Sequence, residues 1–261
     1  MHEFETPGSV SLQIKLPSGR VMVTTADEPR TSVELISTGR RGPDAFDDVV
    51  VRADERHGGH VITVEQKDRF RWGPIQITWG SDLEVRITCP PGSDLELSGG
   101  STDLRAEGEL GEVSAKSASG DLRMQSVRNK LSLKTASGDI SVGMIEAGGS
   151  VVTVSGDLDI RRVQAPLTAR SVSGDVRIGA IEAGELHLQT ISGDARIGVA
   201  RGTRVWIDAV SVSGELGSEL GLADQAPEAD SDAERAGEVV PLHVKTVSGD
   251  VAIVRAAEVL A

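Results

Sequence analysis

One tripeptide, Ser-Gly-Asp, recurs along the chain at a nearly constant interval. Its copies are Ser119-Gly120-Asp121, Ser137-Gly138-Asp139, Ser155-Gly156-Asp157, Ser173-Gly174-Asp175, Ser192-Gly193-Asp194 and Ser248-Gly249-Asp250. With the variants Ser101-Thr102-Asp103 and Ser213-Gly214-Glu215, the acidic residue advances by 18 residues four times and then by 19, 21 and 35. A fixed period of about twenty residues predicts a solenoid, because each repeat is too short to bury a core alone and must stack on its neighbours.

Apolar residues return at fixed positions within each repeat. We number the repeat Ser as position one, so that position zero precedes it and the acidic residue is position three. Positions zero, four and six are aliphatic or small in nearly every copy, as in Val154, Leu158 and Ile160. Because alternate residues of a strand share a face, these three columns are expected to point inward. Positions minus five and minus three are apolar with the opposite parity, which predicts a corner of the chain between minus three and zero.

Polar residues occupy the other columns. Thr or Ser fills position minus one and Ser fills position one. We expect these hydroxyl groups and the acid at position three to form ladders on the outer side, where Ser and Asp also bond backbone groups at bends. The Gly at position two is expected either to spare space on the inward face or to supply a left-handed kink.

The N-terminal third is also predicted to be β-structure. Apolar and polar residues alternate in stretches such as 10–16 and 20–25, and Ser18-Gly19-Arg20 resembles a diverged repeat. We therefore expect residues 1–92 to form irregular first coils or a β cap, and residues 93–261 to form the regular repeats. The predicted fold class is all-β, a single-chain parallel β-solenoid (β-helix) of about 18 residues per coil.

The step of 35 residues contains an acidic segment at 219–240. It holds seven acidic residues and one basic residue, Arg235. Low hydrophobicity with high net charge predicts disorder, so we expect a disordered surface insertion within one coil. A segment that binds a partner through its acidic residues is the alternative.

Composition excludes several classes of protein and of site. The single Cys89 excludes an internal disulfide and disfavours a cysteine-rich zinc site. The polar opening and the lack of an apolar run of about eighteen residues predict a cytoplasmic protein with no membrane insertion. The net charge of −13, without a basic patch, disfavours nucleic acid and anionic membranes as partners.

Three passages together resemble a known bacterial family. They are the opening FETPGSVSLQIKLPSGRVMVTT, the passage CPPGSDLEL and the ladder of SGD repeats. They are similar to a β-strand-repeat domain of unknown function, common in actinobacteria and labelled "putative adhesin". The resemblance covers essentially the whole chain. It implies a β-solenoid and, from the label, a place at the cell surface, and it brings no established activity or catalytic residue.

The acidic column is the first candidate for a metal site. Calcium-binding β-rolls repeat G-G-x-G-x-D-x-U-x about every nine residues, half of the interval seen here, but each coil of this chain has one Gly-Asp pair. We therefore expect the acids to serve the turn, with no specific metal site and only weak binding of calcium. The weak candidates are Asp121, Asp139, Asp157, Asp175 and Asp194.

The histidines give no stronger metal candidate. His57 and His60 stand in a glycine turn and offer two ligands at most. His187 and His243 share the outward position minus four, but we expect them to lie two coils apart, with Asp208 between them. No cofactor is predicted.

The regular repeat favours a non-catalytic structural or interaction module, either adhesin-like or a scaffold. The expected partner is an unidentified protein or a component of the cell envelope, and the chain itself is expected to be a monomer or to self-associate weakly. One alternative is a calcium-binding module of the β-roll kind. Another is a carbohydrate-active β-helix enzyme, which would need clustered carboxylates with basic and aromatic residues in a groove. No catalytic residue is predicted.

Overall fold

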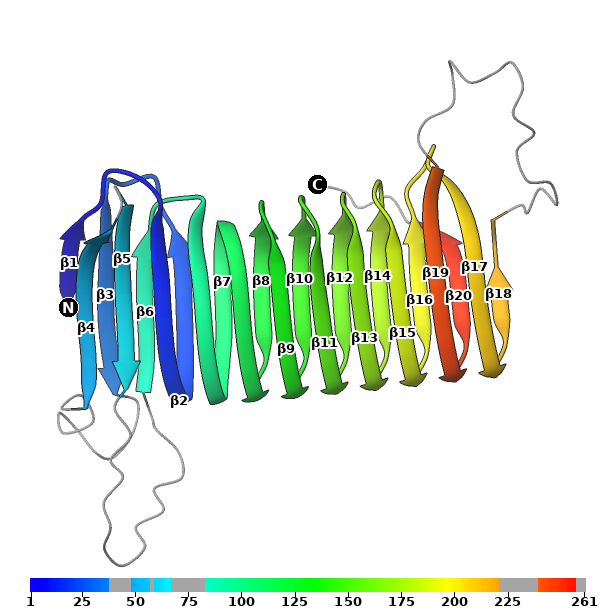
Figure 1. Cartoon of the computed structure of the whole chain (residues 1–261), viewed down its shortest axis with the longest axis horizontal. Helices are drawn as coiled ribbons and strands as arrows, with labels where there is room; N and C mark the ends of the chain where they lie inside the picture. Colours follow the sequence, from blue (N-terminus) through cyan, green and yellow to red (C-terminus); the bar gives the residue numbers. More distant parts are fainter. Residues whose placement is uncertain (38–47, 57–58, 67–82, 221–238, 257–261) are drawn as a thin grey trace, which may run out of the picture. The chain divides into compact units, whose positions relative to one another are not determined.

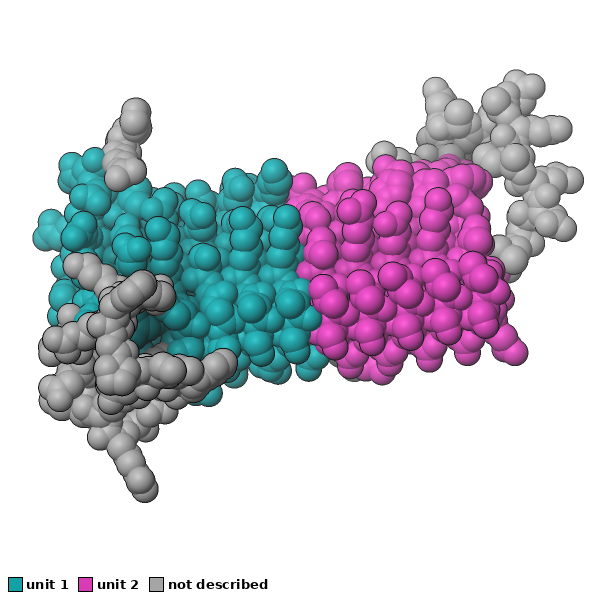
Figure 2. Space-filling view, turned by 60° about the horizontal axis from the view of Figure 1, so that its bottom comes forward, with its two compact units in different colours: residues 1–141 teal, residues 142–261 magenta. Residues whose placement is uncertain are grey.

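The computed structural model describes residues 1–37, 48–56, 59–66, 83–220 and 239–256. Within these residues the chain forms twenty β-strands. The described part of the chain has no helix long and apolar enough to cross a membrane. The chain divides into two compact units, Met1–Ser141 and Val142–Ala261 (Figure 2). In each unit, strands of neighbouring coils pair in parallel, so the predicted all-β solenoid fold is confirmed.

Unit 1 begins with a coil that departs from the repeat in sequence but keeps its register. The strands of unit 1 are β1 (His2–Glu5), β2 (Val10–Thr25), β3 (Arg30–Ser37), β4 (Val49–Arg56), β5 (Gly59–Gln66), β6 (Leu83–Cys89), β7 (Ser93–Ser119), β8 (Leu122–Val127) and β9 (Leu131–Ser137). β2 pairs in parallel with β7, which sets Ser18 opposite Ser101 and Arg20 opposite Asp103. Ser18-Gly19-Arg20 is therefore a diverged rung of the stack.

Antiparallel strands extend this first coil on its other side. The first half of β2 pairs in parallel with β5, and β4 then pairs antiparallel with β5. The second half of β2 pairs with β6, and β3 and then β1 continue from β6 in antiparallel pairs (Figure 1). An end coil without such strands would present a long row of unpaired backbone groups. These strands therefore pair with the edge that β2 would otherwise leave open.

Unit 2 consists of regular coils, each with one strand before the Ser-Gly-Asp corner and one after it. β10 (Ile140–Ile145) contains the boundary between the units, and the strands that follow are β11 (Gly149–Ser155), β12 (Leu158–Val163), β13 (Leu167–Ser173), β14 (Val176–Ile181), β15 (Leu186–Ser192), β16 (Ala195–Val199), β17 (Arg204–Ser213), β18 (Leu216–Ser218), β19 (Val239–Ser248) and β20 (Val251–Arg255). β11, β13 and β15 pair in parallel in that order, as do β12, β14 and β16.

The last two coils of unit 2 are not stacked in sequence order. β19 pairs with β15 on one side and with β17 on the other, and β20 lies in the same way between β16 and β18 (Figure 1). The final coil therefore occupies the place next to β15–β16, and the coil that precedes it in sequence lies outermost. The long step between the two coils allows this, since the chain must travel back past one coil. Being outermost leaves Leu216 50% exposed, whereas its equivalent Val251 is 2% exposed.

Two predictions concern regions that the structure leaves untested. The division of the sequence at 92/93 describes where the repeats become regular, and it stays a prediction. Within the acidic segment 219–240, residues 221–238 lie outside the described residues.

The inward columns form the core of each unit. Positions four and six are buried as predicted: Leu158 and Ile160 are 1% and 0% exposed. Positions minus five and minus three are buried too, as in Leu186 and Leu188. Position zero was expected to point inward, and that prediction is wrong, since Ile191 is 52% exposed.

The reason is that no corner lies between positions minus three and zero. β13 and β15 run without interruption from position minus five to position one, so alternation puts position minus one inward and position zero outward. The expectation of an outer hydroxyl ladder at position minus one is therefore also wrong. Most of these hydroxyl groups are tolerated in the core because they donate to the carbonyl of the repeat Ser, as Thr135 does to Ser137 (3.0 Å) and Thr246 to Ser248 (3.3 Å). The hydroxyl groups of Thr153 and Ser211 have no hydrogen-bond partner among the described residues.

The corner lies at the Gly of position two. Gly174 has a φ of +118°, which residues with a side chain rarely adopt. A Cβ at Gly174 would also overlap the carbonyl oxygen of Gly156 in the neighbouring coil. Of the two predicted roles of this Gly, the kink is thus the one observed, and the close approach between coils adds a second reason for Gly.

Candidate functional site

The outer face of unit 2 carries a column of exposed aliphatic side chains at position zero. The column belongs to five adjacent strands, in the spatial order β11, β13, β15, β19 and β17. Its members, here named the aliphatic column, are Val154 (48% exposed), Val172 (42%), Ile191 (52%), Val247 (48%) and Val212 (77%). Parallel strands lie about 4.8 Å apart, so the column runs for about 19 Å. Water contacts apolar surface along this whole length.

The acidic column stands at the corner and bonds to the backbone of the neighbouring coil. In unit 1, the N–H of Asp139 donates to Oδ1 of Asp121 (2.9 Å). In unit 2, the N–H of Asp175 donates to Oδ1 of Asp157 (2.9 Å), and the N–H of Asp194 donates to Oδ1 of Asp175 (3.0 Å). All five calcium candidates thus take part in one repeated hydrogen bond. The bond gives the acid at position three a structural role.

This ladder follows the spatial order of the coils and not the sequence order. The N–H of Asp250 donates to Oδ1 of Asp194 (2.9 Å), and the N–H of Glu215 donates to Oδ1 of Asp250 (2.8 Å). A carboxylate acceptor at position three therefore links each coil of unit 2 to the one beside it, the outermost coil included. Weak calcium binding along the column stays a prediction.

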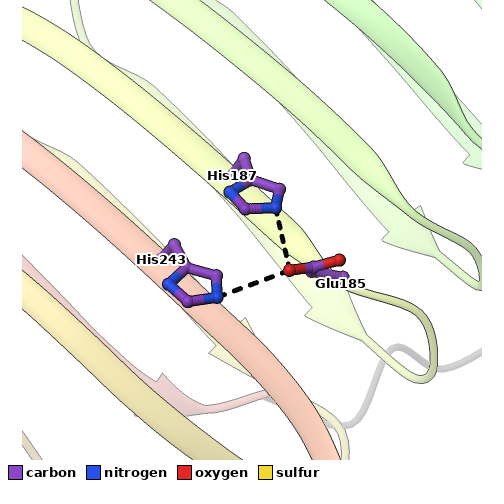
Figure 3. Close-up of side chains that lie close together, drawn as sticks. All are labelled: Glu185, His187 and His243. Atoms are coloured by element: carbon purple, nitrogen blue, oxygen red, sulfur yellow. Dashed lines mark ion pairs between the residues drawn. The ribbon is translucent and has the colours of Figure 1, made fainter.

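A second polar group on the outer face, here named the His–Glu cluster, consists of Glu185, His187 and His243 (Figure 3). His187 on β15 and His243 on β19 are register partners. Nε2 of His187 lies 2.8 Å from Oε1 of Glu185, and Nε2 of His243 lies 3.4 Å from the same oxygen. The two rings are stacked, with centroids 4.7 Å apart and planes 6° apart. Among the described residues, no other group of three metal-binding side chains brings its ligand atoms within 4.8 Å of one another.

Two residues of β17 complete the surroundings of His243. Oδ2 of Asp208, its register partner on that side, lies 3.3 Å from His243 Nδ1. The ring of Trp206 meets the His243 ring edge-on, with centroids 5.3 Å apart, and Trp206 is 52% exposed. His243 is thus the central residue, with carboxylates facing both of its ring nitrogens.

The cysteine lies in unit 1 and offers no reactive thiol near neutral pH. Cys89 at the end of β6 is fully buried. Burial raises the pKa of its thiol to about 11, and a hydrogen bond with Ser93 acts in the opposite direction. Because the thiolate is the reactive form, this group stays protonated and inert near pH 7.

Comparison with protein families decides which family the chain comes from. The family model described as Toastrack DUF4097 matches residues 10–254, nearly the whole length. The chain belongs to the Toastrack family. This agrees with the resemblance to a domain of unknown function that the repeats indicated.

Two solved structures are similar to the Toastrack chain over nearly its full length. The first is a "putative adhesin" from Bacteroides fragilis NCTC 9343, which is 13% identical with a TM-score of 0.55, the match covering 96% of this chain and 95% of that one. The second is a "putative lipid binding protein" from Parabacteroides distasonis ATCC 8503, which is 14% identical with a TM-score of 0.49, covering 97% and 95%. At this identity the first similarity shows the fold alone, and the second carries no argument. Comparison with curated proteins gives no match.

The His–Glu cluster of the Toastrack chain was not predicted from its sequence. Sequence order placed Asp208 between His187 and His243, and this is wrong, because β19 lies between β15 and β17. The step of 35 residues was the signal that could have indicated it, since a long connection lets the chain return past a coil. Of the other candidate pair, His57 lies outside the described residues.

Proposed function

We propose that this Toastrack chain is a non-catalytic, adhesin-like interaction module that binds a protein partner along the aliphatic column of unit 2. The observation that carries the proposal is the run of five aliphatic side chains, each 42% exposed or more, on five adjacent strands. Single exposed aliphatic residues are common on protein surfaces, but a continuous run of them marks a binding surface more often than chance. The side chains of the column are about half exposed or more, so burial in the core does not explain their apolar character.

The size of the column limits what it contributes to binding. Full burial of one Val or Ile side chain is worth about 1.5–3 kcal/mol, and these side chains are already about half buried. Five of them supply roughly 5 kcal/mol, whereas a micromolar complex needs about 8 kcal/mol. The partner therefore also contacts the polar columns that border the aliphatic one.

Charge indicates the chemistry of the partner. Three residues beyond each member of the column stands an acid, such as Asp175 after Val172 and Asp194 after Ile191. The whole chain carries a net charge of −13. A complementary surface has an apolar ridge with basic side chains along one border, as a protein can provide. The adhesin label of the Bacteroides fragilis protein supports a module that attaches to another molecule.

A photo-crosslinking experiment tests this proposal in cells that produce the chain. A photoreactive amino acid replaces Val172 in one variant and Ala136, the equivalent outward residue of unit 1, in the control. We expect an adduct with a second protein at position 172 and little or none at position 136. Equal adducts at the two positions would contradict a binding surface at the column. An adduct with a second copy of the chain would show that the column mediates self-association and does not bind a different protein.

Once the partner is identified, affinity measurements test the column directly. Val172→Ser combined with Ile191→Ser should weaken binding by at least about tenfold, because two half-buried aliphatic contacts are lost. The matched control is Ala118→Ser with Ala136→Ser on unit 1, which should leave the affinity unchanged. If both double variants bind equally well, the column is not the binding surface.

A further inference from the structure

We propose that the His–Glu cluster is a binding site for one divalent transition-metal ion of the zinc class. Its ligands are Glu185, His187 and His243, and Asp208 positions His243. The proposal is independent of the aliphatic column and of any partner. It begins with the convergence of a carboxylate oxygen and two imidazole nitrogens on one point of the surface, all within 4.8 Å of one another (Figure 3).

Carboxylates face both ring nitrogens of His243. Oδ2 of Asp208 lies 3.3 Å from Nδ1, an arrangement in which a carboxylate commonly orients a metal-binding histidine. Nε2 on the other side of the ring faces Oε1 of Glu185, 3.4 Å away. A cation held between Nε2 and this oxygen would bond to both atoms.

The two histidines converge on the same carboxylate oxygen. Their rings are stacked with centroids 4.7 Å apart, and Nε2 of each ring lies within 3.4 Å of Oε1 of Glu185. One divalent ion at this point would balance the negative charges of Glu185 and Asp208 together.

The distances are close to those that a metal centre needs. Zinc binds nitrogen and oxygen ligands at about 2.0–2.1 Å, so neighbouring ligands of a tetrahedral centre lie about 3.3 Å apart. His243 Nε2 and Glu185 Oε1, at 3.4 Å, meet this spacing as they stand. His187 Nε2 lies 2.8 Å from the same oxygen, so the His187 ring has to move outward, and any proton on Nε2 passes to Nδ1 or to water when the metal binds. The His187 side chain is 48% exposed and has room to rotate, so its ring can leave the parallel stack with His243 and turn toward the metal.

The backbone holds the three ligands in place before any metal binds. Glu185 lies directly before β15 and contacts His187, the second residue of that strand, and His243 lies opposite His187 in the paired strand. Two imidazoles with one carboxylate suit zinc and its neighbours, whereas calcium and magnesium prefer oxygen ligands alone. Because the cluster lies on the outer face, water completes the coordination.

Metal titration of the full-length chain tests the proposal. Zn²⁺ is followed by calorimetry, and Co²⁺ by the visible absorption of a four-coordinate centre, at about pH 7.5 where imidazole is neutral. We expect one equivalent of either metal to bind, and Ca²⁺ at the same concentration not to compete. Replacing His187 and His243 by Asn should abolish binding. The matched control replaces the other three histidines, His2, His57 and His60, by Asn and should bind as the unaltered chain does.

Two results of the titration would overturn the proposal. Failure of the unaltered chain to bind Zn²⁺, or equal binding by the His187→Asn, His243→Asn double variant, would show that the cluster is a hydrogen-bonded surface pair only. Circular dichroism checks that the variants stay folded, which is expected because both side chains point outward.

The role of Asp208 has its own test. Asp208→Asn keeps the size of the side chain but removes its charge, and it should weaken Zn²⁺ binding about tenfold or more, as loss of a partner of a ligating His commonly does. Glu185→Gln, which removes a direct ligand, should weaken binding further. Unchanged Zn²⁺ affinity in Asp208→Asn would remove Asp208 from the site.

Discussion

The two units use the same inner residues and different outer ones. On β9 of unit 1 the inward residues are Leu131, Leu133 and Thr135, and on β15 of unit 2 they are Leu186, Leu188 and Thr190. The outward residues are Ser132, Lys134 and Ala136 on β9 but His187, Gln189 and Ile191 on β15. The inner columns and the corner repeat because every coil must pack on the next one. The outer columns are under no such constraint, so differences between the units are the place to look for function.

The largest expected effect tests the inner column. Ile160→Asp places a charge where the side chain is 0% exposed, and it should lower the free energy of unfolding by more than about 3 kcal/mol. Urea denaturation of the full chain measures the change. The control is Val172→Asp at an outward position of the same unit, which should cost less than about 1 kcal/mol. Equal costs would mean that inner and outer columns do not differ as described.

A smaller effect is expected at the corner glycine, where both units should respond alike. Gly174→Ala should destabilise by about 2–4 kcal/mol, because it combines an unfavourable φ with overlap against the backbone of the next coil. Gly138→Ala in unit 1 meets the same two obstacles, a φ of +126° and the carbonyl of Gly120, and should cost the same. Thermal denaturation compares the two variants.

A pair of open-turn glycines separates strain from overlap. Gly202 and Gly92 also have positive φ, +82° and +73°, but a Cβ at either position would meet nothing within 4 Å. Their replacement by Ala should cost only the conformational strain, about 1 kcal/mol. If Gly202→Ala costs as much as Gly174→Ala, the close approach of neighbouring coils is not what selects Gly at the corner.

The acidic ladder is expected to have an effect no larger than that of the open-turn glycines. Asp175→Ala removes the acceptor of the Asp194 N–H and should cost about 1 kcal/mol. Asp175→Asn keeps an oxygen in the same place and should change stability by less than about 0.5 kcal/mol. The same contrast is expected in unit 1 for Asp121, which accepts from Asp139. If Asp175→Asn destabilises the chain in added calcium as much as Asp175→Ala does, stability depends on the charge of the side chain. That result would favour a calcium ladder over a hydrogen-bond ladder.

The sequence predicted the fold because the inner columns are periodic. A step of 18 residues fixes which positions of neighbouring coils lie side by side, and positions four and six were assigned correctly from alternation alone. Position zero was assigned wrongly because Val172 and Ile191 have the composition of core residues, and hydrophobicity does not distinguish a buried column from an exposed one. Strand alternation alone would have assigned position zero correctly. In a straight strand whose position minus five points inward, position zero points outward.

The His–Glu cluster could not be predicted because it depends on the order of the coils. A repeat describes how one coil pairs with a neighbour, and it is the same for every choice of neighbour. β19 and β17 carry inward residues of the same kind, Leu242 and Val244 on β19 and Ile207 and Ala209 on β17. The repeat pattern would therefore allow either strand to pair with β15. Leu242 and Val244 are buried in the inner place, while Ile207 and Ala209 are only half-buried at the outside. Burial of the more apolar coil therefore favours the exchanged order, and the exchange brings His243 to His187.

The smallest change in stability is expected when aliphatic residues like those of the aliphatic column are placed at position zero of unit 1. Ala118→Val with Ala136→Val gives unit 1 a short aliphatic column on the outward side of β7 and β9. Stability should change by less than about 1 kcal/mol, because the new methyl groups stay in water and Val suits an outward strand position at least as well as Ala does. Urea denaturation measures this, and the reverse change, Val154→Ala with Val172→Ala, should be equally silent. A large loss of stability in either double variant would mean that position zero takes part in folding, and the difference between the units would then be structural and not functional. Two silent variants would instead show that the aliphatic column is free to vary, so that its persistence over five strands of unit 2 calls for a partner.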